Sequence, residues 1–107
     1  MAKIRETDLM NAIKDTLTYK GFQVLRLNAG AFFDKSGRYI GRGVPKGTAD
    51  LLAVDKQGRA VWIECKVKPN KPTPEQVEFI DTMRRQGCRA GVCYSVDEAL
   101  ALVGVAL

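Results

Sequence analysis

The chain has 107 residues, with 17 lysine or arginine residues against 12 aspartate or glutamate residues and a formal net charge of +5. We expect residues 1–107 to form a single domain, because this length allows one hydrophobic core and no separate recognition module. The positive charge favours an anionic partner, with nucleic acid first. Histidine is absent from the sequence, which excludes His-based triads and His-ligated zinc. Any catalysis must therefore use carboxylates, lysine and a metal ion.

The sequence predicts a cytoplasmic protein without a membrane partner. No segment reaches the roughly eighteen apolar residues of a membrane span, and the first residues begin no signal-peptide hydrophobic region. The cysteines Cys65, Cys88 and Cys93 are odd in number and lack the spacing of a metal site. We therefore expect them to be reduced packing residues.

The first predicted helix runs from about Glu6 to Lys20, with Gly21 as its C-terminal stop. Its apolar stripe consists of Leu9, Met10, Ile13 and Leu17. Glu6 extends this stripe, so its carboxylate is expected on the face that packs against the sheet. An acid in a first turn also complements the helix dipole, and both interpretations of Glu6 remain open.

A strand over residues 22–28 is predicted next, followed by a small hairpin within residues 29–48. The turns at 34–38 and 55–59 share one pattern, in which aspartate starts the turn and glycine supplies a positive φ. Aromatic residues between the basic ones belong either to the core or to a base-stacking surface. They are Phe32, Phe33 and Tyr39.

Two short apolar runs, residues 50–54 and 60–67, are predicted to pair as a hairpin. Successive side chains on a strand point to opposite faces of a sheet. One face of the second strand should therefore carry Trp62, Glu64 and Lys66.

Asp50, Glu64 and Lys66 are charged residues placed where strands are usually apolar. Burying a carboxylate without a partner costs several kcal/mol even after relaxation. Two acids and one lysine leave an excess of negative charge, which is the arrangement that recruits a hard divalent cation through oxygen ligands. A structural ion pair at the end of the hairpin is the alternative interpretation.

The rest of the chain predicts a helix, a strand and a second, short helix. Thr73 is the expected N-cap of the longer helix, with Gln76 completing a capping box and Gly87 ending the helix. A strand over residues 89–94 follows, and Ser95 with Glu98 is expected to form another capping box. The buried face of the longer helix is expected to carry Val77, Ile80 and Met83, with Phe79 as a further candidate.

This order of elements predicts an α/β fold with a mixed β-sheet flanked by helices on both faces. The strand that contains Glu64 leads through a helix to the last strand, so the two should be parallel and joined by a right-handed crossover. The Glu64 strand is then central, with Asp50 beside it and Glu6 approaching from the first helix.

The pattern resembles the PD-(D/E)xK nuclease superfamily and, within it, the VRR-NUC family. The resembling stretches are Glu6, Gly43-Val44-Pro45, Gly47-Thr48-Ala49-Asp50-Leu51, Glu64-Cys65-Lys66, and Thr73-Pro74-Glu75-Gln76 followed by Gly87 and the strand of Val92. The likeness spans nearly the whole chain and implies a restriction-endonuclease-like core in one VRR-NUC-like nuclease domain. Ala49 departs from the proline that the family commonly has there, which removes a backbone restraint and no ligand.

The resemblance implies metal-dependent hydrolysis of phosphodiester bonds. The implied catalytic residues are Asp50, Glu64, Lys66 and Gln76, and the implied ligands of Mg²⁺ or Mn²⁺ are Glu6, Asp50, Glu64 and the backbone carbonyl of Cys65. Lys66 would position the attacking water and stabilise developing negative charge. Gln76 is equally explained as a helix cap.

The basic loops are expected to bind the sugar-phosphate backbone of DNA, which carries no base code. The residues concerned are Lys35, Arg38, Arg42, Lys46, Lys68 and Lys71. The resemblance implies a structure-selective endonuclease for branched DNA such as four-way (Holliday) junctions, acting as a homodimer in a bacterial or phage-infected cell. A restriction- or homing-type endonuclease and a non-catalytic nucleic-acid-binding module on the same fold are the alternatives.

Overall fold

The computed structural model describes residues 4–27 and 31–105, without the side chains of residues 31, 32 and 39–42. The helices and strands follow each other as α1 Glu6–Tyr19, β1 Gln23–Arg26, β2 Ala31–Phe33, β3 Tyr39–Arg42, β4 Leu51–Val54, β5 Ala60–Cys65, α2 Pro74–Arg85, β6 Arg89–Cys93 and α3 Val96–Val103. Every helix and strand predicted from the sequence is present, and β1 ends at Arg26, before the predicted end at residue 28.

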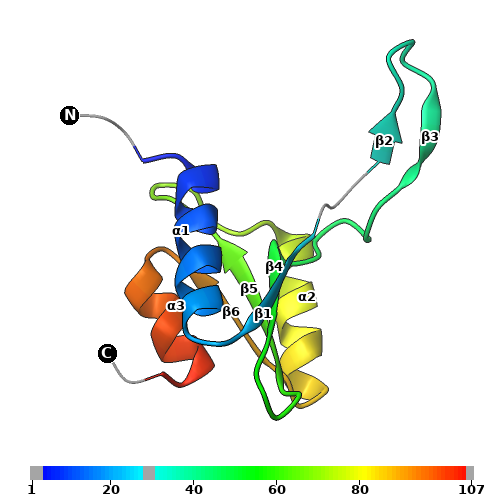
Figure 1. The fold of residues 1–107 in the computed structure, drawn as a ribbon. Helices are drawn as coiled ribbons and strands as arrows, with labels where there is room; N and C mark the ends of the chain where they lie inside the picture. Colours follow the sequence, from blue (N-terminus) through cyan, green and yellow to red (C-terminus); the bar gives the residue numbers. More distant parts are fainter. Residues whose placement is uncertain (1–3, 28–30, 106–107) are drawn as a thin grey trace.

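The main sheet has four strands in the order β1-β4-β5-β6. β1 and β4 are antiparallel, as are β4 and β5, whereas β5 and β6 are parallel, with Glu64 opposite Val92. α1 and α3 lie together on one face of this sheet and α2 lies on the other (Figure 1). The predicted α/β class, with a mixed sheet between helices, is confirmed, and β5 is an inner strand as expected.

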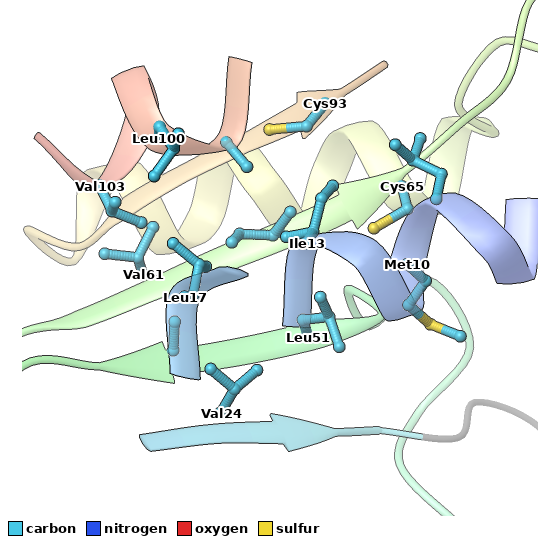
Figure 2. Packing of buried hydrophobic residues seen from close by; sticks show 14 residues of the cluster. Met10, Ile13, Leu17, Val24, Leu51, Val61, Cys65, Cys93, Leu100 and Val103 are labelled. Atoms are coloured by element: carbon cyan, nitrogen blue, oxygen red, sulfur yellow. The ribbon is translucent and has the colours of Figure 1, made fainter. Parts of the chain in front are cut away.

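The hydrophobic core lies between the main sheet and the helices α1 and α3. Ile13 and Leu17 of α1 are fully buried against Leu51 of the sheet (Figure 2). Ile63 of β5 is fully buried in the same cluster. Cys65 and Cys93 are buried in the same core and are not disulfide-bonded, and burial raises the pKa of both thiols. These two cysteines are therefore packing residues, as predicted.

The opposite face of the sheet is covered by α2. Trp62 of β5 contacts Phe79 of α2 edge-to-face, with ring centroids 5.2 Å apart and planes at 81°. The alternation of β5 thus sends Val61 and Ile63 into the core with α1 and α3, while Trp62 and Glu64 point to the α2 side.

Helix capping agrees with the sequence at α2 and only in part at α3. The Thr73 hydroxyl accepts from the Gln76 amide at 3.2 Å, and the Gln76 side chain accepts from the Thr73 amide at 2.8 Å. Ser95 accepts from the Glu98 amide, but the Glu98 carboxylate accepts from Tyr94 N–H. The predicted capping box at Ser95 is therefore confirmed for the serine hydroxyl and wrong for the glutamate carboxylate. Ser95 has a more extended backbone (φ −154°) than Thr73 (φ −72°), and the Glu98 carboxylate reaches the amide of Tyr94 in place of the amide of Ser95.

Strands β2 and β3 form a separate two-stranded hairpin with an irregular register after Phe32. The hairpin projects away from the rest of the molecule, and among the described residues neither strand contacts another helix or strand (Figure 1). Phe33 is 60% exposed, so of the two places that the sequence left open for this ring the core is wrong. The side chains of Phe32 and Tyr39 lie outside the described part of the chain.

The β2–β3 and β4–β5 turns have the same local chemistry, as predicted. Asp34 accepts hydrogen bonds from the amides of Ser36 and Arg38, and Asp55 accepts from those of Gln57 and Arg59, each at 2.9 Å. The glycines in the two turns have φ values of +86° and +82°. Within the described residues, no helix combines the length and apolarity needed to cross a membrane.

Candidate metal and active site

Three carboxylates converge at one end of the main sheet, where β4 begins and β5 ends. Glu6 is the first residue of α1, Asp50 immediately precedes β4, and Glu64 is near the end of β5. One oxygen from each carboxylate lies within 4.8 Å of the others. The antiparallel pairing of β4 with β5 sets Asp50 beside the end of β5. The packing of α1 on the sheet brings the first turn of α1 to the same end of the sheet. The structure thus brings together the three acids that the sequence singled out.

Glu64 is the most deeply buried charged residue among those described, with 1% of its side chain exposed. Its Oε2 atom accepts from Gln76 Nε2 at 3.2 Å, whereas its Oε1 atom is buried without a hydrogen-bond donor. Burial raises the pKa of Glu64 to about 8, and the nearby Asp50 carboxylate adds to this rise while Lys66 opposes it. Without a metal ion, burial and the neighbouring Asp50 therefore favour the protonated form of Glu64.

Asp50 is oriented by the backbone of the neighbouring strand. Its Oδ2 atom accepts a hydrogen bond from Cys65 N–H at 2.9 Å. This contact joins the start of β4 to the end of β5 directly at the site. Cys65 therefore lies beside the acidic cluster through its amide, while its side chain points into the core. The role of its carbonyl as a ligand stays a prediction.

Lys66 supplies the positive charge of the cluster. Its Nζ atom lies 3.6 Å from Glu64 Oε2 and 3.9 Å from Glu6 Oε1, and its side chain is 11% exposed. One ammonium group facing three carboxylates leaves an excess of negative charge when all are ionised. The donor set of oxygen atoms, together with the donorless Glu64 Oε1, fits a hard divalent cation such as Mg²⁺ or Mn²⁺.

Gln76 caps α2, as predicted, and also contacts the acidic cluster. Its Oε1 atom accepts from the Thr73 amide, which turns its Nε2 atom toward Glu64. The capping box at the start of α2 therefore orients the amide that holds Glu64. The importance of Thr73 for the site was not apparent from the sequence, because the capping pattern by itself does not show what faces the glutamine.

Gly47, in the segment before Asp50, lies against the first turn of α2, which also carries Gln76. Its φ is +92°, and a Cβ atom there would lie 2.6 Å from the carbonyl oxygen of Glu75. Glycine is thus required both by the backbone conformation and by the close approach of two chain segments. The signal in the sequence was a glycine shortly before Asp50, but its partner in α2 could not be read from it.

The predicted DNA-binding residues fall into three places. Lys35 and Arg38 are exposed at the tip of the projecting hairpin, and Lys46 is exposed before β4. Lys68 and Lys71 are exposed in the loop after β5, and Lys68 lines a cavity of about 300 Å³ together with Glu6. The side chain of Arg42 lies outside the described residues. Lys68 therefore lies beside Glu6 of the acidic cluster, whereas Lys35 and Arg38 lie away from it on the projecting hairpin.

A four-stranded mixed sheet with Asp, Glu and Lys side chains converging at one end of its inner strands is typical of a nuclease-type α/β domain. The comparisons make this specific: the model of the VRR-NUC domain family matches residues 5–97, and the chain belongs to this family.

A solved structure described as a VRR_NUC domain is similar to the chain, with a TM-score of 0.66 and 23% sequence identity over 92% of each chain. At this identity the likeness shows the fold. Comparison with curated proteins gave no significant match.

Proposed function

We propose that this VRR-NUC domain is a Mg²⁺- or Mn²⁺-dependent endodeoxyribonuclease that cuts branched DNA such as four-way junctions. The observation that carries the proposal is the buried Glu64 Oε1 atom, which has no donor and belongs to a cluster of three carboxylates. A buried polar atom without a partner is costly, and a divalent cation would satisfy it. Membership of a nuclease family supports the same conclusion.

The residues that would hold the metal are Glu6, Asp50, Glu64 and the carbonyl of Cys65. When bound, such a cation polarises the scissile phosphate and lowers the pKa of a bound water. The side chains of Asp50 and Glu64 reach the cluster already oriented, the first by the Cys65 amide and the second by Gln76. The site therefore needs little rearrangement to bind a cation.

Lys66 has the position expected of a residue that orients the attacking water and stabilises the negative charge that develops on the phosphate. Its ammonium group lies between Glu6 and Glu64 and is mostly buried. Gln76 acts on Glu64 and, through it, on the geometry of the site. We assign Asp50, Glu64 and Lys66 direct roles and Gln76 a positioning role.

Exposed basic residues would hold the sugar-phosphate backbone on two sides of the acidic cluster. The loop after β5 supplies Lys68 and Lys71, and Lys46 lies before β4. The projecting hairpin, with Lys35 and Arg38 at its tip, would reach DNA farther from the cut. A domain of this size cuts one strand, so symmetric cutting of a junction calls for a homodimer.

The test is a cleavage panel of single-stranded, duplex, flap and four-way-junction DNA with and without Mg²⁺ or Mn²⁺. We expect metal-dependent cutting of the branched substrates, and loss of cutting in Asp50→Asn with binding retained. Asp97→Asn, which changes an exposed acid at the start of α3, is the matched control and should cut normally.

Each alternative predicts a different result from this panel. Cutting of plain duplex at one defined site, with junctions ignored, would support a restriction- or homing-type enzyme. Binding without cutting under every metal would replace the nuclease with a non-catalytic nucleic-acid-binding module. Light scattering that shows a monomer both free and on a junction would contradict the dimer.

A further inference from the structure

A second, larger cavity of about 620 Å³ lies next to the one that Glu6 lines. It is bounded by the N-terminal half of α1 and by the segment that leads from β6 into α3. The helices α1 and α3 pack side by side (Figure 1). Its apolar wall is formed by Leu9, Ala12, Val67, Tyr94 and Val96. The volume falls within the range of sites that enclose small organic ligands.

This cavity adjoins the smaller one that Glu6 lines, because Ile4, Val67 and Lys68 line both. We call the two cavities together the groove, with Glu6 of the acidic cluster at one end. The Lys68 ammonium group marks the junction between them, with its Nζ atom 5.9 Å from the centre of the Tyr94 ring. A chain that leaves the acidic cluster along this groove first meets a cation and then an aromatic ring.

The acidic residues that line the larger cavity already have partners. Asp8 accepts two hydrogen bonds from Arg5, each at 3.2 Å. Glu98 accepts from the Tyr94 amide at 2.8 Å. Arg5 offsets the charge of Asp8, whereas Glu98 keeps its charge at the rim, where it is exposed. The groove thus offers an apolar and aromatic wall with a lysine at its entrance, which suits a flat apolar group whose phosphate lies at the Lys68 end, away from Glu98. The ring is also held in place, because the Tyr94 hydroxyl donates to the Asn70 carbonyl oxygen at 2.9 Å.

We propose that this groove binds one unpaired DNA nucleotide adjacent to the scissile phosphate, with its base against Tyr94 and its phosphate near Lys68. The proposal rests on the proposed nuclease function and names the feature of the substrate that is recognised. A base inside a duplex has both faces covered by its neighbours, whereas an unpaired base can stack on a side chain. Such a subsite would favour branched or frayed DNA over a continuous duplex.

The experiment measures binding in EDTA, so that its result does not depend on cutting. The probes are a flap DNA with 2-aminopurine as its first unpaired nucleotide and a fully paired duplex of the same sequence. Ala12→Trp fills the groove from the exposed side of α1, and Tyr94→Leu removes the ring. Ala101→Trp, at an exposed position of α3 that does not line the groove, is the matched control.

We expect the wild-type protein to quench 2-aminopurine fluorescence on the flap, as stacking on an aromatic ring does. Tyr94→Leu should lose the quenching, and both Tyr94→Leu and Ala12→Trp should bind the flap about tenfold more weakly, which is the effect typical of one base stack. The affinity for the duplex should not change in either variant, and the control should behave as wild type. Thermal melting of each variant checks that the fold is kept.

Flap binding by Ala12→Trp equal to that of wild type, or undiminished quenching by Tyr94→Leu, would overturn the proposal. A change in oligomeric state of Ala12→Trp by light scattering, with flap binding unchanged, would also overturn it and assign the groove to contact between copies of the chain. A failed cleavage panel together with intact flap discrimination in EDTA would instead refute the nuclease and retain the nucleotide site.

Discussion

The two hairpins of this protein have the same turn and opposite surroundings. In β4–β5 and in β2–β3 an aspartate accepts two backbone amides and a glycine at positive φ closes the turn. β4 and β5 lie inside the main sheet, with helices on both faces, and hold the acidic cluster between them. β2 and β3 pair only with each other among the described residues. Local chemistry thus builds a hairpin, and packing decides whether it becomes a scaffold or a projecting arm.

This comparison bears on how the domain divides its work. Catalytic groups must be held within a fraction of an ångström, and a buried strand pair can do so because its side chains are locked by their neighbours. Among the described residues the projecting hairpin has no such neighbours, and the contact with the DNA backbone that we propose for it tolerates small displacements. The following predictions test this difference, from the largest expected effect to the smallest.

The first prediction compares a lysine from each hairpin. Lys66→Met should lower the rate of DNA cutting by about a thousandfold or more, because charge stabilisation in a buried site is worth several kcal/mol. Lys35→Met, at the exposed tip of β2–β3, should lower it by less than about tenfold through weaker binding of the phosphate backbone. Single-turnover cleavage with excess protein separates the two effects. Equal losses in both variants would contradict the division.

The second prediction concerns the buried carboxylate of the main sheet. The pKa of Glu64 is raised from 4.5 to about 8, so the folded state keeps a proton that the unfolded state has released. Without metal, the free energy of unfolding should therefore fall as the pH rises from about 4.5 to 8. A bound divalent cation displaces this proton, so the stabilisation by a fixed Mg²⁺ concentration should grow over the same window.

The measurement is urea unfolding across this pH range, with and without Mg²⁺. Glu64→Gln should remove most of the pH dependence, whereas Glu75→Gln, an exposed acid of α2, should keep it. A wild-type profile that is flat between pH 4.5 and 8 would show that Glu64 is ionised throughout and that the site is organised differently.

The third prediction tests the contact between the segment before β4 and the start of α2. Gly47→Ala should destabilise the fold by about 1–3 kcal/mol or more, since both its positive φ and its approach to Glu75 exclude a Cβ atom. The substitution should also weaken Mg²⁺ binding, because the first turn of α2 carries Gln76. Denaturant unfolding and metal titration check the two effects. Loss of stability with unchanged metal affinity would separate this contact from the site.

The fourth and smallest effect compares the two turn glycines directly. Gly58→Ala in β4–β5 should lower the free energy of unfolding by about 1 kcal/mol, because alanine is strained at the positive φ of this position. A steric clash adds nothing, since none of the described atoms lies within 4 Å of a Cβ atom placed there. Gly37→Ala creates the same strain in β2–β3 but should leave global unfolding unchanged, since this hairpin can open without the core. A common loss in both variants would show that the projecting hairpin unfolds together with the rest.

Sequence patterns of short range were sufficient for most of the elements. The alternation in residues 60–66 predicted which side chains of β5 enter the core and which face α2, and the capping pattern at Thr73 predicted the start of α2. Prediction was less successful where the outcome depended on backbone conformation or on distant neighbours. Glu98 bonds one amide earlier than expected, and Phe33 is exposed because, in the part of the chain that the structure describes, its hairpin packs against no other helix or strand.

The sequence by itself determined the identity of the acidic residues and the strands that carry them, because buried charges in an apolar pattern need partners. Only the tertiary structure decided that α1 delivers Glu6 to the same place, that the cap of α2 turns Gln76 toward Glu64, and that Glu64 Oε1 is left without a donor. These features depend on packing between elements far apart in the chain. Local preferences specify each element, whereas the convergence of their ends follows from burying one shared core.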